Sequence, residues 1–128
     1  EVERTFWEKA TILHAEYHRP ADQAIRERFA RHYADVAALW EHPARAAALA
    51  RLDLLDRVVK HKSRFFASSW AYYETAKPGS LKLLPPSHRE TDLTQDYDRM
   101  RTMFMVKPPS FKEVLRVLSE AEREINGS

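Results

Sequence analysis

The spacing of the apolar residues is the feature that most constrains the fold of this chain. Apolar side chains recur every three or four residues over almost the whole length, which is the period of a helix with one buried face. In the first such segment they are Phe6, Ala10, Leu13 and Tyr17. Thr5 and Glu8 form a T-x-x-E capping box, and Pro20 disfavours helix at the residue before it. We therefore predict a first helix from about Thr5 to just before Pro20.

Further helices are predicted over residues 21–41, 43–66, 91–105 and 110–126. The positions expected to face the core are Ile25, Phe29, Tyr33, Val36 and Trp40, then Leu49, Leu52, Leu55, Val59 and Phe66, then Leu93, Tyr97, Met100 and Phe104, and finally Phe111, Val114, Leu115 and Leu118. Ser110 and Glu113 form a second capping box. Residues 77–90 hold three of the seven prolines and are predicted to form an ordered loop, and a short helix is one interpretation of residues 68–76. No segment predicts a strand, so we expect one domain over residues 1–128, an all-α bundle of about five helices.

The composition excludes several classes of function. With only 2 glycines, at positions 79 and 127, the chain cannot build a glycine-rich phosphate loop or a dinucleotide fingerprint. The absence of cysteine excludes disulfides and a thiol nucleophile, and suits a reducing compartment. A net charge of +2 is too small an excess to predict nucleic-acid binding from charge alone. No apolar run approaches the roughly 20 residues of a membrane span, so we expect a soluble, cytoplasmic protein without membrane contact.

Two motifs invite a comparison with metal sites. His14 and His18 lie one helical turn apart, but the glutamate of the HAEYH segment stands in the wrong place for an HExxH motif. The DYD segment at residues 96–98 looks like a pair of magnesium-binding acids, yet positions i and i+2 of a helix lie about 200° apart. We therefore predict no metal ligands here. Instead we expect His14 at the edge of the apolar stripe, His18 at a helix C-terminus, and the DYD acids on a solvated helix face.

A basic segment over residues 57–64 precedes two phenylalanines. Its cations are Arg57, Lys60, His61, Lys62 and Arg64. If the segment is exposed, the cations could contact phosphates and Phe65 and Phe66 could stack on bases. The pattern alone favours a simpler interpretation, in which both phenylalanines belong to the core and the cations are solvated.

Lys9 and Asp35 both stand at the rim of a predicted buried face. At about 100° per residue, Lys9 lies some 40° from Leu13 on the first helix, and Asp35 lies some 40° from Leu39 on the second. One interpretation is that both are ordinary edge residues, with Lys9 solvated and Asp35 paired with Arg31 one turn earlier. The other is that the two charges serve a common site. The pattern alone favours the first.

Several segments, in order and spacing, resemble the C-terminal half of the AbiEii/AbiGii nucleotidyltransferase toxins of type IV toxin–antitoxin and abortive infection systems. These segments are RTFWEKATILHAEYHR, RHYADVAAL, VVKHKSRFF, WAYYETAKPGSLKLLPP, DYDRMRTMF and FKEVLRVLSEAEREING. The resemblance covers roughly residues 3–127, and RTFWEK and RHYxD are its most specific parts. Ala34 departs from the bulkier residue common in the family, which affects packing more than chemistry.

The resemblance implies that Lys9 contacts a nucleoside triphosphate as a point charge, and that Asp35 faces the same site, orienting the acceptor or taking its proton. Arg4, Arg31 and His32 flank the two motifs and are supporting candidates for nucleotide binding. The full-length protein would use Mg2+ and an NTP to transfer a nucleotidyl group to an acceptor such as tRNA. A cognate antitoxin would act without forming a stable complex.

The resemblance also implies a missing partner lobe. In this family an N-terminal lobe carries a Gly-Ser loop and metal-binding acids, and neither is seen in this chain. Because the chain opens at Glu1 without an initiator methionine, we expect it to be the helical C-terminal lobe of a longer protein and to be inactive alone. We expect the surface around Lys9 and Asp35, with parts of Trp7 and His14, to face the N-terminal lobe and to favour self-association when that lobe is absent.

Two functions of other classes fit the same residues. The chain could be a non-catalytic helical module that binds RNA or a protein partner through residues 57–64, or it could have a purely scaffolding role.

Overall fold

The computed structural model describes residues 2–65, 70–101 and 108–127, and these residues form helices without any strand among them. The α-helices are α1 (Val2–Tyr17), α2 (Ala30–Glu41), α3 (Ala44–Leu49), α4 (Leu52–Phe65), α5 (Glu90–Met100) and α6 (Phe111–Asn126). Two short 3-10 helices, η1 (Tyr73–Thr75) and η2 (Ser87–Arg89), lie between α4 and α5. The predicted all-α fold is confirmed. Within the described ranges, no helix is both long and apolar enough to span a bilayer.

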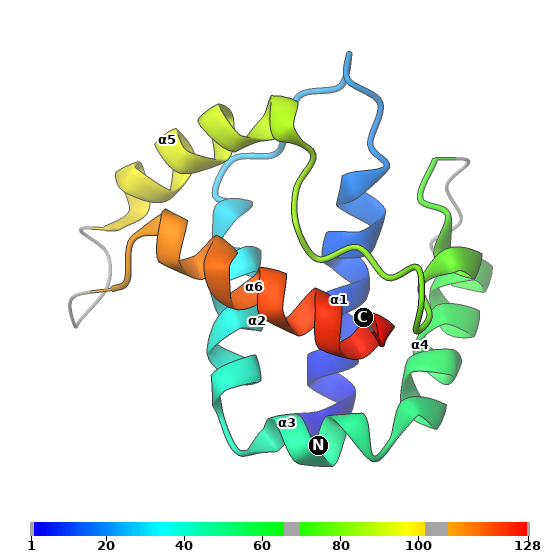
Figure 1. The fold of residues 1–128 in the computed structure, drawn as a ribbon. Helices are drawn as coiled ribbons and strands as arrows, with labels where there is room; N and C mark the ends of the chain where they lie inside the picture. The colour runs from blue at the N-terminus through cyan, green and yellow to red at the C-terminus, as the bar shows by residue number, and fades with distance from the viewer. Residues whose placement is uncertain (1, 66–69, 102–107, 128) are drawn as a thin grey trace.

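Helix α1 occupies the middle of the molecule. It contacts α2 along one side and α4 along the other, and α3 joins these two helices across one end (Figure 1). Helix α6 crosses in front and packs mainly on α2, while α5 lies against the beginning of α2 (Figure 1). The buried side chains of this arrangement form one core that includes Phe6, Trp7, Leu13, Tyr33, Val36, Trp40, Leu55, Leu81, Leu93 and Leu118. Trp7 Nε1 donates to the carbonyl of Ala48 at 3.0 Å, which fixes α3 across the end of α1.

The first helix begins earlier than the sequence pattern predicts. It starts at Val2, so Thr5 lies inside the helix and the predicted capping box at its start is wrong. No residue between Val2 and Thr5 disfavours helix, and Arg4 pairs with Glu8 one turn later at 3.6 Å. The chain therefore continues the helix back past the residue that resembled a cap.

The second helix begins nine residues later than predicted, at Ala30, because contacts from other segments hold residues 20–29 in a loop. Asp96 of α5 accepts hydrogen bonds from the backbone amides of Arg28 and Ala30, both at 2.8 Å, and so caps α2 from outside. Arg28 has a positive φ of 66°, which no continuous helix allows. Asp96 is therefore buried, 2% exposed, and its predicted place on a solvated face is wrong.

Arg89 holds the same loop from its other end. Its Nη2 donates to the carbonyls of Pro20 and Gln23 at 2.9 and 2.5 Å, although only 5% of the residue is exposed. Both carbonyls therefore accept from a distant side chain, and the Pro20 carbonyl also accepts from the Gln23 amide in a turn, instead of bonding within a helix. Local periodicity over residues 21–29 could not reveal this competition.

The predicted third helix is two helices that meet at residues 50–51. A straight helix could not both cross the end of α1 and run beside it, as α3 and α4 do (Figure 1). The bend turns Leu52 outward, with 41% of the residue exposed, so its predicted core position is wrong. Leu55 is buried, and Leu49 and Val59 pack partly on the core, as predicted. Phe66 lies outside the described residues.

The predicted ordered loop over residues 77–90 is confirmed as far as residue 86, after which η2 occupies residues 87–89 and residue 90 begins α5. Leu81 and Leu83 are fully buried. The Asn126 side chain of α6 accepts from the amides of Gly79 and Leu81 at 2.8 and 3.2 Å and donates to the Leu81 carbonyl at 2.9 Å. The loop is thus hydrogen-bonded to α6 as well as packed. Within residues 68–76 the structure describes the 3-10 helix η1, while residues 68–69 lie outside the described ranges.

The last two helices agree with the predictions where they are described. Helix α5 buries Leu93, Tyr97 and Met100, whereas the predicted end of that helix and Phe104 lie outside the described residues. Helix α6 is capped by Ser110, whose side chain accepts from the amide of Glu113 at 3.1 Å. The Glu113 carboxylate pairs with Arg116 instead of completing the box. Gly127 ends the helix with a positive φ of 81°.

Candidate functional site

One face of α1 is left open between α2 and α4. It carries Thr5, Glu8, Lys9 and Ile12, which at about 100° per residue fall within one arc of roughly 100°. Glu8 is exposed and the other three are partly exposed, whereas Phe6, Trp7, Ala10 and Leu13 around the rest of the helix are buried. We call these four residues the open face. Charged side chains from the neighbouring helices border it on both sides.

The border with α2 is formed by Lys9 and Asp35. Lys9 Nζ donates to Asp35 Oδ2 at 3.2 Å, and the two side chains are 30% and 34% exposed. The predicted placement of both residues at the rim of the core is therefore confirmed. The alternative pairing of Asp35 with Arg31 is not observed, because Asp35 pairs with Lys9 and Arg31 extends to solvent. A cation and an anion from sequence positions 26 apart thus meet at one place.

His32 stands beside this pair and is only partly exposed. Burial lowers the pKa of His32, and the nearby charge of Lys9 lowers it further, while Asp35 and Glu16 act in the opposite direction. Its ring packs edge-on against Phe29 at a centroid distance of 4.8 Å. Its Nδ1 is buried and has no hydrogen-bond partner among the described residues. A histidine ring with one nitrogen unpartnered among the described residues therefore lies close to Lys9 and Asp35.

Glu16 was not predicted as a site residue, and it closes one end of the open face. It is 3% exposed and its carboxylate accepts from Arg19 Nε at 2.7 Å. The Arg19 guanidinium in turn lies 4.7 Å from the centre of the Trp70 ring. Glu16 follows Lys9 by seven residues, two helical turns, so this spacing was the signal that could have placed both on the same side of α1.

Lys62 was also missed as an individual residue, and it forms the border with α4. Its Nζ donates to the backbone carbonyl of Glu8 at 2.8 Å. Burial lowers the pKa of Lys62 to about 8, with the charge of Glu8 acting in the opposite direction. The sequence contained a signal, because Lys62 follows Leu55 by seven residues and Val58 by four, so that a lysine occupies a position on the apolar stripe of α4.

The other predicted nucleotide-binding candidates lie further from the pair. Arg4 is on α1, five residues before Lys9 and thus about 7.5 Å along the helix axis, and it pairs with Glu8. Arg31 lies in the first turn of α2 and is exposed. The structure therefore brings Lys9, Asp35 and His32 together, places Arg4 at the far end of the open face, and leaves Arg31 outside it.

Of the two histidines that resembled a metal site, His14 lies in α1 within the core and His18 immediately follows the end of that helix. His14 is fully buried, and its Nδ1 accepts from the Lys82 amide at 2.9 Å while its Nε2 is bonded to Thr75 Oγ1 and the Tyr72 carbonyl at 2.8 and 3.1 Å. Burial lowers the pKa of His14 to about 4. Within the described ranges, no group of three or more His, Asp or Glu side chains could hold a metal ion. Because Trp7 and His14 are fully buried, the expectation that they form part of an exposed surface is wrong.

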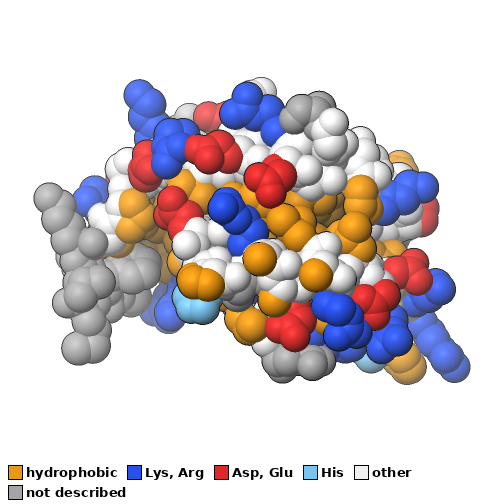
Figure 2. Space-filling model, turned by 60° about the horizontal axis from the view of Figure 1, so that its bottom comes forward, with side chains coloured by type: hydrophobic (Ala, Val, Ile, Leu, Met, Phe, Trp, Pro, Cys, Tyr) orange, Lys and Arg blue, Asp and Glu red, His pale blue; other side chains and the backbone are white. Residues whose placement is uncertain are grey.

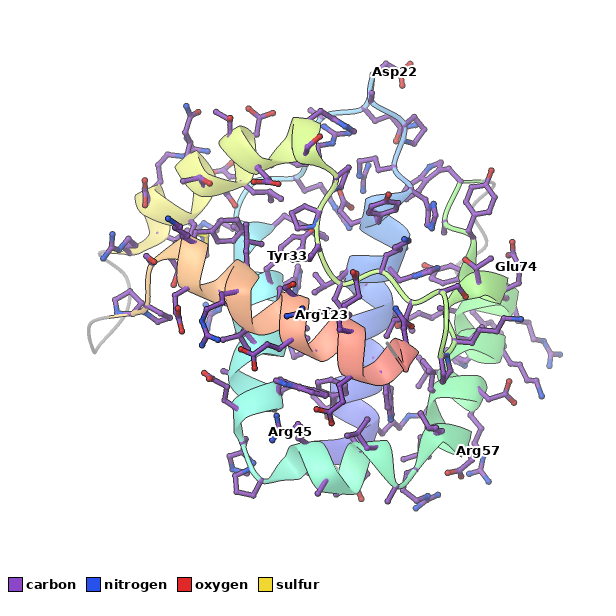
Figure 3. The ribbon with its side chains drawn as sticks, viewed as in Figure 1. Asp22, Tyr33, Arg45, Arg57, Glu74 and Arg123 are labelled. Atoms are coloured by element: carbon purple, nitrogen blue, oxygen red, sulfur yellow. The ribbon has the colours of Figure 1, made fainter. Side chains whose placement is uncertain are left out.

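The basic segment on α4 is exposed at its C-terminal end. Phe65 is 62% exposed, so its predicted core position is wrong, and Arg64 lies 5.4 Å from its ring centre. Nearer the start of the helix, Arg57 and Lys60 pair with Asp53 and Asp56 of α4. Figure 3 shows Arg57 on the outer side of α4, and Figure 2 shows acidic and basic side chains interspersed over the face that it presents. Uncompensated charge and an exposed aromatic ring thus meet only towards the end of α4, within the described part of the chain.

A family comparison agrees with these observations. The model of the family described as nucleotidyl transferase AbiEii toxin, type IV toxin–antitoxin system, matches residues 1–117 of the 128, which include all of the open face, α2 and α4. No curated protein and no solved structure gave a match. A type IV toxin–antitoxin system pairs the toxin with an antitoxin, so the family implies an antitoxin partner. The chain belongs to the AbiEii family of nucleotidyltransferase toxins.

Proposed function

We propose that this chain is the helical lobe of a nucleotidyltransferase and that it supplies Lys9 and Asp35 to the nucleotide site. The observation that carries the proposal is the 3.2 Å contact between these two side chains, at the edge of an open helix face, in a chain of the AbiEii family. A partly exposed ion pair contributes little to stability, so stability alone is a weak reason for placing these charges together.

The two residues have different roles in the proposed reaction. The acceptor hydroxyl oxygen attacks the α-phosphorus of the nucleoside triphosphate, the bond to the β-phosphate oxygen breaks, and pyrophosphate leaves. Lys9 offsets the negative charge that shifts towards the leaving group. Asp35 orients the acceptor hydroxyl or takes its proton, and it also holds the Lys9 ammonium in place. His32, partly exposed beside the pair, is a supporting candidate for nucleotide binding.

The remaining parts of the site belong, in this proposal, to an N-terminal lobe. The described residues offer no group of carboxylates that could hold Mg2+, so we assign its ligands and the Gly-Ser loop to that lobe. Mg2+ would neutralise phosphate charge during transfer. The helical lobe alone is then inactive, and its open face is free to self-associate.

The acceptor is proposed to be an RNA such as tRNA, bound through the C-terminal end of α4. The observation in favour is the 62% exposure of Phe65 beside Arg64, because exposed aromatic rings next to cations can stack on bases. The same observation supports the rival function, a non-catalytic module that binds RNA through residues 57–64. We also propose that the protein acts in the cytoplasm and that its antitoxin works without a stable complex.

The experiment that tests the proposal is nucleotide transfer by the full-length protein. Each of the four α-labelled nucleoside triphosphates is incubated with total RNA, Mg2+ and either the natural protein or Lys9→Met. Lys112→Met, at an exposed lysine of α6, is the control. We expect label in RNA with the natural protein and the control but not with Lys9→Met. RNA binding without transfer of any nucleotide would support the non-catalytic module instead.

A further inference from the structure

The cations around the open face differ in how their charge is balanced. Lys9 is paired with the Asp35 carboxylate at 3.2 Å, and Arg4 is paired with the Glu8 carboxylate at 3.6 Å. Lys62 has only a backbone carbonyl as its hydrogen-bond partner among the described residues, the Glu8 oxygen at 2.8 Å. A carbonyl carries only a partial charge, whereas a partly buried ammonium such as that of Lys62 is balanced fully only by an anion. Lys62 is therefore the cation of this face that lacks a paired carboxylate.

Lys62 contacts α1 directly beside Lys9. Lys62 contacts the carbonyl of Glu8, which immediately precedes Lys9 in α1, whereas the Lys9 ammonium contacts Asp35 of α2 on the opposite border of the open face. Thr11 Oγ1 donates to the same carbonyl at 2.9 Å, so that oxygen already has a second donor. Lys60, two residues away on α4, is different because its side chain is 76% exposed and pairs with Asp56 at 2.9 Å.

The lowered pKa of Lys62 is consistent with an anion that binds beside its ammonium. Burial lowers the pKa of its ammonium to about 8, because the loss of water disfavours the charged form more than the charge of Glu8 favours it. A phosphate oxygen placed at the open face would supply the opposite charge and raise that pKa again.

We propose that Lys62 is a phosphate-binding residue that, together with Lys9, holds the triphosphate of the nucleotide across the open face of α1. This inference rests on the proposed function, since it assigns a second cation to the same substrate. Lys9 shares its charge with Asp35 and so contributes less than one full positive charge to a ligand. Lys62 provides the charge that Lys9 cannot, on the opposite border.

The test measures the binding of inorganic tripolyphosphate to the full-length protein by calorimetry. The variants are Lys62→Met, which keeps the apolar stem without the charge, and Lys62→Arg, which keeps the charge. Lys60→Met is the matched control on the same helix. We expect Lys62→Met to weaken binding at least tenfold, Lys62→Arg to retain most of it, and Lys60→Met to stay within twofold of the natural protein. Equal affinities for Lys62→Met and Lys60→Met would overturn the proposal.

A second measurement separates ligand binding from a structural role. The pKa of the Lys62 ammonium is followed by NMR with and without saturating tripolyphosphate, and thermal unfolding confirms that each variant is folded. We expect the pKa to rise on binding, and an unchanged value would show that Lys62 only supports α1. Transfer activity is assayed in parallel. Loss of transfer in Lys9→Met with natural tripolyphosphate binding in Lys62→Met would reject Lys62 and keep the proposed function. Full transfer by both variants would reject the assignment of Lys9 to the nucleotide site, and absence of transfer by the natural protein would reject the function itself.

Discussion

Lys9 Nζ and Asp35 Oδ2 lie 3.2 Å apart and connect α1 to α2 at the edge of the open face. The contact joins the two segments, RTFWEK and RHYAD, that are most specific to the family resemblance. Both side chains remain about one third exposed, so each can contact a ligand while it stays close to the other. We therefore expect the ion pair to contribute little to the stability of the fold and much more to the binding of a ligand.

The first prediction concerns the stability of that pair. Lys9→Ala and Asp35→Ala should each lower the free energy of unfolding by less than about 1 kcal/mol, because partly exposed ion pairs are screened by water. Urea denaturation of the full-length protein measures this. Lys60→Ala, from an exposed pair on α4, should behave similarly. A loss above about 3 kcal/mol would mean that the pair is a structural element of the core.

The second prediction concerns the cap that α5 provides for α2. Asp96→Ala removes the acceptor of two backbone amides, of Arg28 and Ala30, and should lower the free energy of unfolding by about 2 kcal/mol. Asp98→Ala, two residues along and exposed, should change it by less than about 0.5 kcal/mol. Hydrogen exchange should show faster exchange of the Arg28 and Ala30 amides in Asp96→Ala only. Equal stability of the two variants would contradict the assigned cap.

The third prediction is a pH dependence centred on His14. Its pKa is about 4 in the folded protein and 6.5 in the unfolded chain, so between these values the unfolded chain binds the proton more strongly. The stabilisation is fully present above pH 6.5 and is lost as the pH falls towards 4, by up to about 3 kcal/mol. The charged or titrating groups that face His14 are His18, Lys82 and Glu74.

Urea denaturation at pH 7 and pH 5 measures the slope. His14→Gln should reduce the difference in unfolding free energy between the two pH values. The exposed His88→Gln should leave that difference unchanged. His18 and His32 also have pKa values lowered by burial, so part of the slope should persist in His14→Gln. An unaltered slope in His14→Gln would show that His14 is not the titrating group.

Periodicity predicted the helices well where each helix satisfies its own backbone. The last helix is the clearest case, because its Ser110 cap, apolar stripe and terminal Gly127 are local signals that agree. The start of α2 could not be predicted in this way. Its cap is a carboxylate 66 residues away from Ala30, and no local pattern identifies such a partner. The same holds for Arg89, which keeps the Pro20 and Gln23 carbonyls out of a helix.

The candidate site was predictable only in part, because its residues come from separate helices that meet through packing. Wheel geometry placed Lys9 and Asp35 at the rims of two separate helices, but only the packing of α1 against α2 shows that they meet. Lys62 was missed within a run of cations, although its spacing from Leu55 and Val58 places it on the apolar stripe of α4; only the packing of α4 against α1 shows that it contacts the Glu8 carbonyl. Phe65 was expected in the core because aromatic residues at helical spacing are usually buried, and the course of α4 places it outside instead.

The measurement that tests the account most directly is a double-mutant cycle on nucleotide transfer by the full-length protein. The initial rate of label transfer to RNA is compared for the natural protein, Lys9→Ala, Asp35→Ala and the double variant, with folding checked by thermal unfolding. If the two residues act as a unit in the transfer step, each single variant should lose roughly a hundredfold or more in rate, and the double variant should lose little beyond the worse single one. Natural transfer rates in both folded single variants would contradict the central claim that this pair serves the reaction.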